Sequence, residues 1–357
     1  MMHMLLSNLD IQKKRLMALL AIEIFQHKFI LCLAFSVFVS SCQLVSGDEL
    51  AFFARLNLPT GARGPESLAF NGKGDEFYTG VSDSRILKYE LANHAFVNFA
   101  TTSPLRNKAI GDDRNDTKLG EAPCRPLGVA INYNNGDLYI ADGVCGLAVV
   151  GSNGGVANTI ANSVNGIPLL FPNAIDIDPK TETVYFTDAG SIFQKSMDII
   201  EILSSGDTSG KLLKYDPQTK QISVLLTELS GATGVAVSGD GAFVLVSEYI
   251  AKQIRRYWIR GPLAGTSDIF IELAGSPDNI KRTVLGDFWV AVTMVDLQLA
   301  VPILVPFGQR INPIGVILEN FSLEVQYRNA IVSEVQENAW GIFVGTLLGS
   351  SVGIYRR

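Results

Sequence analysis

Four oxygen-bearing side chains stand at matching places along the chain. Glu66, Asn173 and Asp278 each follow a proline directly, and Asn279 is the next residue after Asp278. Carboxylate and amide oxygens are the ligands that Ca²⁺ and Mg²⁺ prefer. These four residues therefore predict a hard-cation site, with Ca²⁺ as the candidate ion. A structural interpretation stays open, because Asp and Asn after proline also cap turns through side-chain-to-backbone hydrogen bonds.

Each of these positions heads one copy of a sixfold repeat between Pro65 and Val352. In each copy a turn leads into a short apolar strand, and a Gly/Asp/Asn turn then leads into a strand rich in Tyr, Phe, Trp and Val. The copies are spaced by roughly 45 to 60 residues, the period of a four-stranded propeller blade. We therefore expect an all-β fold, a six-bladed β-propeller of four-stranded antiparallel blades, as a single domain over residues 48–357. Innermost strands converge on a central channel, so equivalent residues of the copies belong to one site. The copies begin at Pro65, Pro126, Pro172, Ala232, Pro277 and Ala330.

Two segments lie outside the repeat. Residues 49–58 are apolar enough to supply the strand that closes the ring with the C-terminal blade, which removes exposed strand edges. Residues 191–209 interrupt the third copy between its second and third strands, and residues 197–203 within them are a short helix candidate. A loop of this kind on one propeller face is expected to cap the channel.

Residues 1–47 have the pattern of a targeting segment. Lys28 precedes an apolar run over residues 29–39, and small residues before Asp48 offer a cleavage site. The segment is either a cleaved signal peptide or an uncleaved signal anchor, and it is the one part expected to contact a membrane. Both interpretations place the rest of the chain in the secretory pathway, in the vacuole, the endoplasmic reticulum lumen or the extracellular space.

The cysteines and sequons agree with that compartment. Cys124 and Cys145 remain after the leader, and in an oxidising compartment they are candidates for a disulfide, with two buried free thiols as the alternative. Asn115 and Asn320 each begin an N-glycosylation sequon. Asn115 lies in a polar, loop-like stretch, whereas Asn320 is next to strand residues.

Charge and histidine content exclude several functions. The formal net charge is −6 and no basic stripe is present, so a nucleic-acid partner is not expected. Of the three histidines, His3 and His27 lie in the leader, which leaves His94. A Ser-His-Asp triad or a zinc site built on several imidazoles is thereby excluded.

Several motifs together resemble the strictosidine synthase-like family, plant six-bladed propellers related to paraoxonases and gluconolactonase-type proteins. The resemblance covers nearly all of residues 48–357. The motifs are GPES at 64–67, CRPLG at 124–128, VYFTD at 184–188, GKLLKYDP at 210–217, DNIKR at 278–282 and GTL at 345–347.

The resemblance to strictosidine synthase itself implies a glutamate acid/base in the sixth blade. Counting back from Gly345, that position falls at Ser333, with Glu334 beside it. One step along a strand reverses the face of the side chain, so Glu334 is expected to point away from the channel unless a bulge intervenes. A serine hydroxyl does not exchange protons at the required pKa. The catalytic residue is thus unassigned, and the resemblance argues against strictosidine formation.

The resemblance to calcium-dependent esterases and lactonases points to a different chemistry. Glu66, Asn173 and Asp278 match the positions where those relatives hold their ion, whereas Thr233 replaces their asparagine in the fourth copy. The leading interpretation is metal-assisted hydrolysis of an ester or lactone, a small molecule bound in the central channel. The alternatives are a synthase that condenses tryptamine with the aldehyde of secologanin, and a non-catalytic binding propeller.

Overall fold

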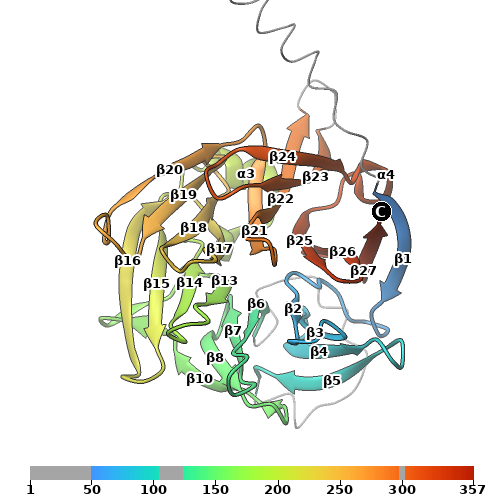
Figure 1. The fold of residues 1–357 in the computed structure, drawn as a ribbon, viewed down its shortest axis with the longest axis horizontal. Coiled ribbons are helices and arrows are strands. Elements are labelled where there is room, and N and C mark those ends of the chain that lie inside the picture. Colours follow the sequence, from blue (N-terminus) through green and yellow to red (C-terminus); the bar gives the residue numbers. More distant parts are fainter. Residues whose placement is uncertain (1–49, 104–123, 297–301) are drawn as a thin grey trace, which may run out of the picture. The chain divides into compact units, whose positions relative to one another are not determined.

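A computed structural model describes residues 50–103, 124–296 and 302–357 of the chain. Leu50–Arg356 form one unit in which four-stranded antiparallel sheets surround a centre (Figure 1). The leader prediction for residues 1–47 and the sequon at Asn115 lie outside the described residues. No helix within the described ranges is long and apolar enough to cross a membrane.

The sheets are six blades, as the repeat predicts, and each begins with its innermost strand. Blade 1 consists of β2 (Ala69–Phe70), β3 (Glu76–Gly80), β4 (Arg85–Glu90) and β5 (Ala95–Thr101), with β9 (Gly155–Val156) added in parallel. Blade 2 consists of β6 (Pro126–Ile131), β7 (Leu138–Asp142), β8 (Gly146–Val150) and β10 (Asn158–Ala161). Blade 3 consists of β13 (Pro172–Ile177), β14 (Val184–Asp188), β15 (Gly210–Asp216) and β16 (Gln221–Leu229).

The second half of the ring follows the same order. Blade 4 consists of β17 (Ala232–Val237), β18 (Phe243–Glu248), β19 (Gln253–Trp258) and β20 (Ser267–Glu272). Blade 5 consists of β21 (Ser276–Arg282), β22 (Phe288–Asp296), β23 (Ile303–Ile311) and β24 (Ile317–Ser322). Blade 6 consists of β25 (Val332–Asn338), β26 (Gly341–Thr346), β27 (Ser351–Arg356) and β1 (Ala51–Asn57). A hairpin, β11 (Ser163–Val164) with β12 (Ile167–Pro168), and helix α4 (Glu324–Tyr327) lie between blades.

The two ends of the unit close the ring. Strand β1 pairs antiparallel with β27, from Ala51 opposite Arg356 to Asn57 opposite Ser351. The first strand of the unit thereby completes the last blade, as residues 49–58 predict, and covers the edge of β27. Figure 1 shows the two strands side by side.

The core lies between blades, where the second strands are buried on both faces. All residues of β7, β14 and β18 are buried, and these strands consist mostly of apolar, β-branched and aromatic residues. Trp289 and Phe186 are among the largest fully buried side chains. The recurring aromatic residues of the repeat are thus part of the packing between neighbouring blades.

A β-bulge recurs where the innermost strands begin. The register of each of β6, β13, β17, β21 and β25 shifts within its first few residues. A bulge inserts an extra residue and re-aims the side chains around it. Gly128 and Gly234 follow the bulged residue in blades 2 and 4, where an added Cβ would collide with the backbone of the next blade. These glycines allow the inner strands to approach one another closely around the channel.

The insertion of blade 3 contains two short helices, α2 (Ile192–Lys195) and α3 (Ile199–Ser204). Asp198 caps α3 by accepting hydrogen bonds from the backbone N–H groups of Ile200 and Glu201. The helix predicted over residues 197–203 is therefore present, displaced by the cap toward its C-terminus. The buried Phe193 and Ile202 hold the insertion against the rest of the propeller.

Candidate functional site

A small pocket lies at the end of the channel where the innermost strands begin, and we call it the lid pocket. Its polar floor consists of Glu66, Asn173, Thr233 and Asp278. Its volume of about 30 Å³ is enough for a single water molecule or ion. The walls are mostly apolar, and four of their residues come from the insertion of blade 3, which caps the channel as expected. The wall residues are Phe171, Phe193, Met197, Ile199, Ile202, Tyr249, Ile331 and Leu347.

The floor of the lid pocket contains oxygen atoms that have no protein partner. Glu66 Oε2 and Asn173 Oδ1 are buried and accept no hydrogen bond among the described residues. Buried polar atoms are nearly always paired, so each of these acceptors needs an explanation such as an ion or a water. The structure thus brings Glu66, Asn173 and Asp278 together from blades 1, 3 and 5, as their place in the repeat predicts.

Hydrogen bonds from Asn279 and Thr233 hold the residues of the floor in place. Asn279 Nδ2 donates to Glu66 Oε1 (3.1 Å) and to the Glu66 carbonyl oxygen (3.2 Å). Thr233 Oγ1 donates to the Pro277 carbonyl oxygen (3.1 Å). Asn279, predicted as a cation ligand, therefore orients Glu66 through its amide nitrogen. Thr233 joins the floor at the position where the fourth copy departs from asparagine.

Glu334 does not point away from the channel, which corrects the expectation from strand alternation. In blade 6, Val332 pairs with Thr346 but Glu334 pairs with Gly345, so Ser333 is the extra residue of a bulge. The Ser333 hydroxyl donates to the Glu66 carbonyl oxygen (2.7 Å). The bulge allows Ser333 and Glu334 both to reach the inner strands of the adjoining blades.

The Glu334 carboxylate is fully buried beneath the lid pocket. Lys281 Nζ lies 3.9 Å from Glu334 Oε2 and donates to Ser67 Oγ at 3.2 Å. The Gln336 amide, with its nitrogen toward the acceptors, donates to Glu334 Oε1 at 3.2 Å. Glu334 is absent from the lining of the lid pocket. It therefore sits one layer further along the channel than the residues of the floor.

Burial raises the pKa of three carboxyl groups at this end of the channel, and neighbouring carboxylates add to the shift for two of them. Burial raises the pKa of Glu66 to about 7, although Arg125 and the Asn279 hydrogen bond act in the opposite direction. Burial raises the pKa of Glu334 to about 8, against the attraction of Lys281. Burial, together with the charges of Glu66 and Glu334, holds the pKa of Asp278 well above its usual range. The site is thus short of positive charge.

The corner of blade 2 supplies the buried cation nearest to Glu66. Arg125 is 1% exposed, and its Nη2 donates to the Leu347 carbonyl oxygen (3.0 Å). Asp142 Oδ1 fixes the backbone of this corner by accepting from the N–H groups of Arg125, Val144 and Cys145. Sequence reasoning missed Arg125. A charged residue within the otherwise apolar motif CRPLG could have indicated a buried cation near the channel.

Cys124 and Cys145 form a disulfide bond at the same corner, with a Cα–Cα distance of 5.3 Å. Their sulfur atoms lie within 4.8 Å of a carboxylate oxygen of Asp142, an arrangement that on distance alone resembles a metal site. The bond removes both thiolates, and Asp142 Oδ1 already accepts three backbone hydrogen bonds. This cluster is therefore a structural corner of the blade, without the free thiolate ligands that a metal needs.

The acidic residues at the ends of other second strands have the same structural role. Asp188 accepts from the backbone N–H groups of Leu170 (3.0 Å) and Phe171 (2.6 Å). Glu248 accepts from the Ser230 N–H (2.9 Å) and pairs with Arg255. These carboxylates are satisfied by hydrogen bonds, in contrast to Glu66.

Tyr249 is a second residue that sequence reasoning missed. It follows Glu248 directly and lines the lid pocket, and its ring packs edge-on against Phe193 of the insertion. Burial and the charge of Asp278 raise the pKa of Tyr249, so its hydroxyl keeps its proton at neutral pH. It is a neutral hydrogen-bond donor beside the floor.

Two further predicted positions lie away from the site. Asn320 is exposed on the outermost strand of blade 5, where its Oδ1 accepts from Gln309 Nε2 (2.7 Å). Glycosylation at Asn320 stays a prediction. His94 lies in the β4–β5 hairpin with a φ of 50° and is not part of the lid pocket.

The floor fits a hard cation. It offers two carboxylates, from Glu66 and Asp278, and the amide oxygen of Asn173. Glu66 Oε2 and Asn173 Oδ1 have no hydrogen-bond partner among the described residues, and the charges of neighbouring carboxylates disfavour a charged Asp278. Oxygen-only donor sets of this kind suit Ca²⁺ or Mg²⁺ better than softer metals.

Comparison with known proteins agrees with the fold and the motifs. A sequence model described as strictosidine synthase matches residues 173–262. Strictosidine synthase-like protein 12 of Arabidopsis thaliana is 41% identical over 319 residues, which cover 89% of this chain and 93% of the relative. Strictosidine synthase of Catharanthus roseus is 36% identical over 291 residues, 81% of this chain and 82% of the relative.

Among solved structures, two propellers share the fold at low sequence identity. A gluconolactonase from Xanthomonas campestris superposes with a TM-score of 0.61 at 13% identity, covering 87% of this chain and 95% of that one. A calcium-binding protein, regucalcin, from Agrobacterium tumefaciens gives 0.58 at 12% identity, covering 85% and 93%. At such identities the likeness concerns the fold alone. On its sequence relatives and its six blades, the chain belongs to the strictosidine synthase-like family of β-propellers.

Proposed function

We propose that the lid pocket binds a calcium ion and hydrolyses an ester or lactone of a small molecule. The observation that carries the proposal is the pair of buried, unpartnered acceptors, Glu66 Oε2 and Asn173 Oδ1, next to Asp278. Glu66, Asn173 and Asp278 would hold the ion, with the Thr233 hydroxyl beside them. A bound calcium ion supplies a Lewis acid that polarises an ester carbonyl.

The other residues of the pocket suit binding and the exclusion of water. The walls from Phe171, Phe193 and Met197 give an apolar surface for the body of a substrate. The protonated Tyr249 hydroxyl offers a hydrogen bond to an oxygen of the substrate. Because the pocket holds about 30 Å³, a substrate enters only when the insertion of residues 191–209 moves away. Solved neighbours named as gluconolactonases and as calcium-binding regucalcin support this chemistry by analogy.

Turnover of esters and lactones tests the proposal. The full-length protein is assayed on phenyl acetate, an aryl ester of a longer acid and a δ-lactone, with calcium or with a chelator. We expect calcium-dependent hydrolysis that Glu66→Gln reduces at least a hundredfold. Glu272→Gln is the matched control, because it makes the same change on an exposed residue of the outer strand β20.

The outcomes separate the three interpretations. Calcium binding without turnover on any substrate favours a binding propeller. Turnover that is equal with calcium and with chelator contradicts the role of the ion. Loss of activity in both variants alike contradicts the role of Glu66.

The condensation of tryptamine with secologanin is a second candidate, because the bulge turns Glu334 toward the inner strands. The carboxylate nevertheless lies outside the lid pocket beside Lys281, and the preceding Ser333 uses its hydroxyl to donate to the Glu66 carbonyl oxygen. We expect no strictosidine from this protein. Product formation that Glu334→Gln abolishes would establish the synthase instead.

We also propose that the protein matures in the secretory pathway. The Cys124–Cys145 disulfide suits an oxidising compartment, and residues 1–47 have the pattern of a targeting segment. Vacuole, endoplasmic reticulum lumen and extracellular space agree equally with these features. Imaging of the tagged chain in plant cells, with N-glycosidase treatment to probe Asn115 and Asn320, distinguishes these compartments from the cytosol.

A further inference from the structure

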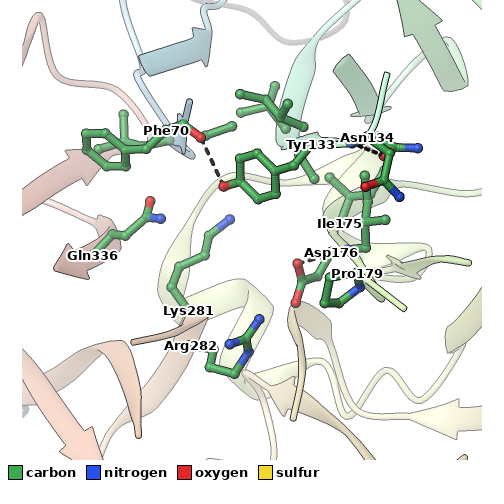
Figure 2. Close-up of a pocket in the computed structure, with 16 residues that line it drawn as sticks. Phe70, Tyr133, Asn134, Ile175, Asp176, Pro179, Lys281, Arg282 and Gln336 are labelled. Carbon is green, nitrogen blue, oxygen red and sulfur yellow. Dashed lines mark hydrogen bonds between the residues drawn. The ribbon is translucent and has the colours of Figure 1, made fainter. Parts of the chain in front are cut away.

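A second cavity opens at the other end of the channel, where the innermost strands end, and we call it the opposite-mouth cavity. It has a volume of about 140 Å³ and is lined from blades 1, 2, 3, 5 and 6. Figure 2 shows Tyr133, Lys281 and Gln336 around one space, with Arg282 and Asp176 at its edge. The proposed hydrolysis at the lid pocket does not use this cavity.

The spare hydrogen-bonding groups of the cavity are donors. Asn132 lines it and is 3% exposed, and its Nδ2 has no partner among the described residues. Its Oδ1 is already used, because it accepts from the Asn134 N–H (3.0 Å). Arg282 Nε donates to the Val237 carbonyl oxygen (3.0 Å), which leaves its terminal nitrogens for a ligand. Lys281 Nζ adds a second positive charge.

The carboxylate of the cavity already accepts two backbone hydrogen bonds. Asp176 Oδ1 accepts from the Ile177 N–H and Asp176 Oδ2 from the Val237 N–H, both at 2.8 Å. The Tyr133 hydroxyl donates its proton to the Phe70 carbonyl oxygen (3.0 Å), as Figure 2 shows. A ligand that brings further donors would therefore compete with these backbone groups for Asp176. A ligand rich in acceptors would satisfy Asn132 Nδ2 and the two cations.

Size and apolar lining narrow the class of ligand. A volume of about 140 Å³ is many times the roughly 10–15 Å³ that a cavity needs to hold one water molecule, so a small organic molecule fits. Apolar side chains form part of the lining, among them Phe70, Ile131 and Ile177. An inorganic anion would leave this surface unused. A carboxylate matches the fork of an arginine and can carry a short hydrocarbon body.

We propose that the opposite-mouth cavity binds a small organic carboxylate. Its head would contact Asn132 Nδ2, Lys281 and Arg282, and its body would lie against the apolar lining. The opposite-mouth cavity shares no lining residue with the lid pocket, so the proposal is tested separately from calcium binding and hydrolysis.

Isothermal titration calorimetry of the full-length protein tests the site with butyrate as the probe. Butylamine has the same hydrocarbon body with the opposite charge, and inorganic phosphate has negative charge without a body. We expect saturable binding of butyrate at one site per chain and at least tenfold weaker binding of both other probes. This comparison needs no variant.

Asn132→Asp tests the assignment of the head group. The variant keeps the oxygen that accepts from the Asn134 N–H and replaces the unpartnered donor with a second carboxylate oxygen. Asp178 occupies the equivalent turn of blade 3, where its Oδ1 accepts from the Lys180 N–H (2.9 Å), so this turn accommodates aspartate. We expect butyrate binding to weaken at least tenfold.

Asn312→Asp is the matched control. Asn312 Oδ1 also accepts within its own turn, from the N–H groups of Ile314 (3.1 Å) and Val316 (2.9 Å), but Asn312 does not line the cavity. Binding is expected to stay within twofold of the unmodified protein. Equal binding of butyrate and butylamine, no binding of butyrate, or equal weakening in both variants would each overturn the proposal. Phosphate binding as tight as butyrate binding would overturn the part played by the apolar lining.

Discussion

The two ends of the channel are built from the same six inner strands, yet they leave opposite kinds of polar atom without a partner. Within the part of the chain that the structure describes, the unpartnered atoms lining the lid pocket are acceptors, Glu66 Oε2 and Asn173 Oδ1, whereas the one lining the opposite-mouth cavity is a donor, Asn132 Nδ2. The first residues of the strands thus suit a cation and the last residues suit an anion. A propeller can carry two different sites along one axis, because side chains at successive levels of the inner strands vary independently.

Lys281 connects the two ends. Its ammonium group lies 3.9 Å from Glu334 Oε2 on one side, and it lines the opposite-mouth cavity on the other. Lys281 therefore partly compensates the negative charge of Glu334. The positive charge that acts most strongly on Glu66 is that of Arg125.

The pH dependence of stability tests whether the lid end is short of positive charge. The pKa of Glu66 is raised to about 7 and that of Glu334 to about 8, so the folded protein holds protons that the unfolded chain has released. The free energy of unfolding of the metal-free protein should then fall by several kcal/mol as pH rises from about 5 to about 8. Denaturant unfolding across this range, with chelator present, measures the change. A flat profile would show that the carboxyl groups are already compensated.

Substitution of single acids contrasts the lid end with the blade corners. Asp188→Asn should lower the free energy of unfolding by about 2 to 3 kcal/mol, because its carboxylate accepts two backbone N–H groups. Glu66→Gln should raise it by about 1 kcal/mol in the metal-free protein, because it removes a buried charge beside Asp278. Urea unfolding of both variants gives the two signs. A change of the same sign in the free energy of unfolding for both variants would contradict the distinction between Asp188, whose carboxylate is fully hydrogen-bonded, and Glu66, whose carboxylate is not.

Thr233→Asn sharpens the assignment of the lid pocket by adding an amide oxygen to its floor. The resemblance to calcium-dependent relatives places asparagine at this position, and Thr233 lines the pocket. Calcium affinity should rise about tenfold, equivalent to about 1.4 kcal/mol. Competition with a fluorescent calcium chelator measures it. Ser267→Asn is the control, because Ser267 is exposed on the outer strand β20. Its calcium affinity should equal that of the unmodified protein.

The fold was predictable because its signals are local and repeated. The strands, the Asn/Asp/Gly turns and the apolar segment before the first copy can each be recognised from a few neighbouring residues. Six copies of the same pattern strengthen the prediction of a six-bladed propeller. The meeting of Glu66, Asn173 and Asp278 followed from their equal place in the repeat.

The orientation of Glu334 was not predictable in the same way. It depends on one extra residue, Ser333, in the register of β25 against β26, and β25 itself carries no glycine or proline there, although Gly345 of β26 lies opposite Glu334. The opposite-mouth cavity was missed for a related reason. Asn132 and Arg282 lie at strand ends, where asparagine usually belongs to a turn and arginine is usually exposed to solvent. The cavity that they share depends on how five blades meet, which the sequence pattern does not show.

Calorimetric titration of calcium into the chelator-treated, full-length protein tests whether the lid pocket holds a cation. The protein and the Glu272→Gln control should each bind one calcium ion per chain, and Glu66→Gln should reduce the affinity at least a hundredfold while remaining folded by circular dichroism. Magnesium in place of calcium shows whether the floor selects between the two ions. The absence of any binding heat, or equal calcium binding by Glu66→Gln, would contradict a cation site at the lid end of the channel.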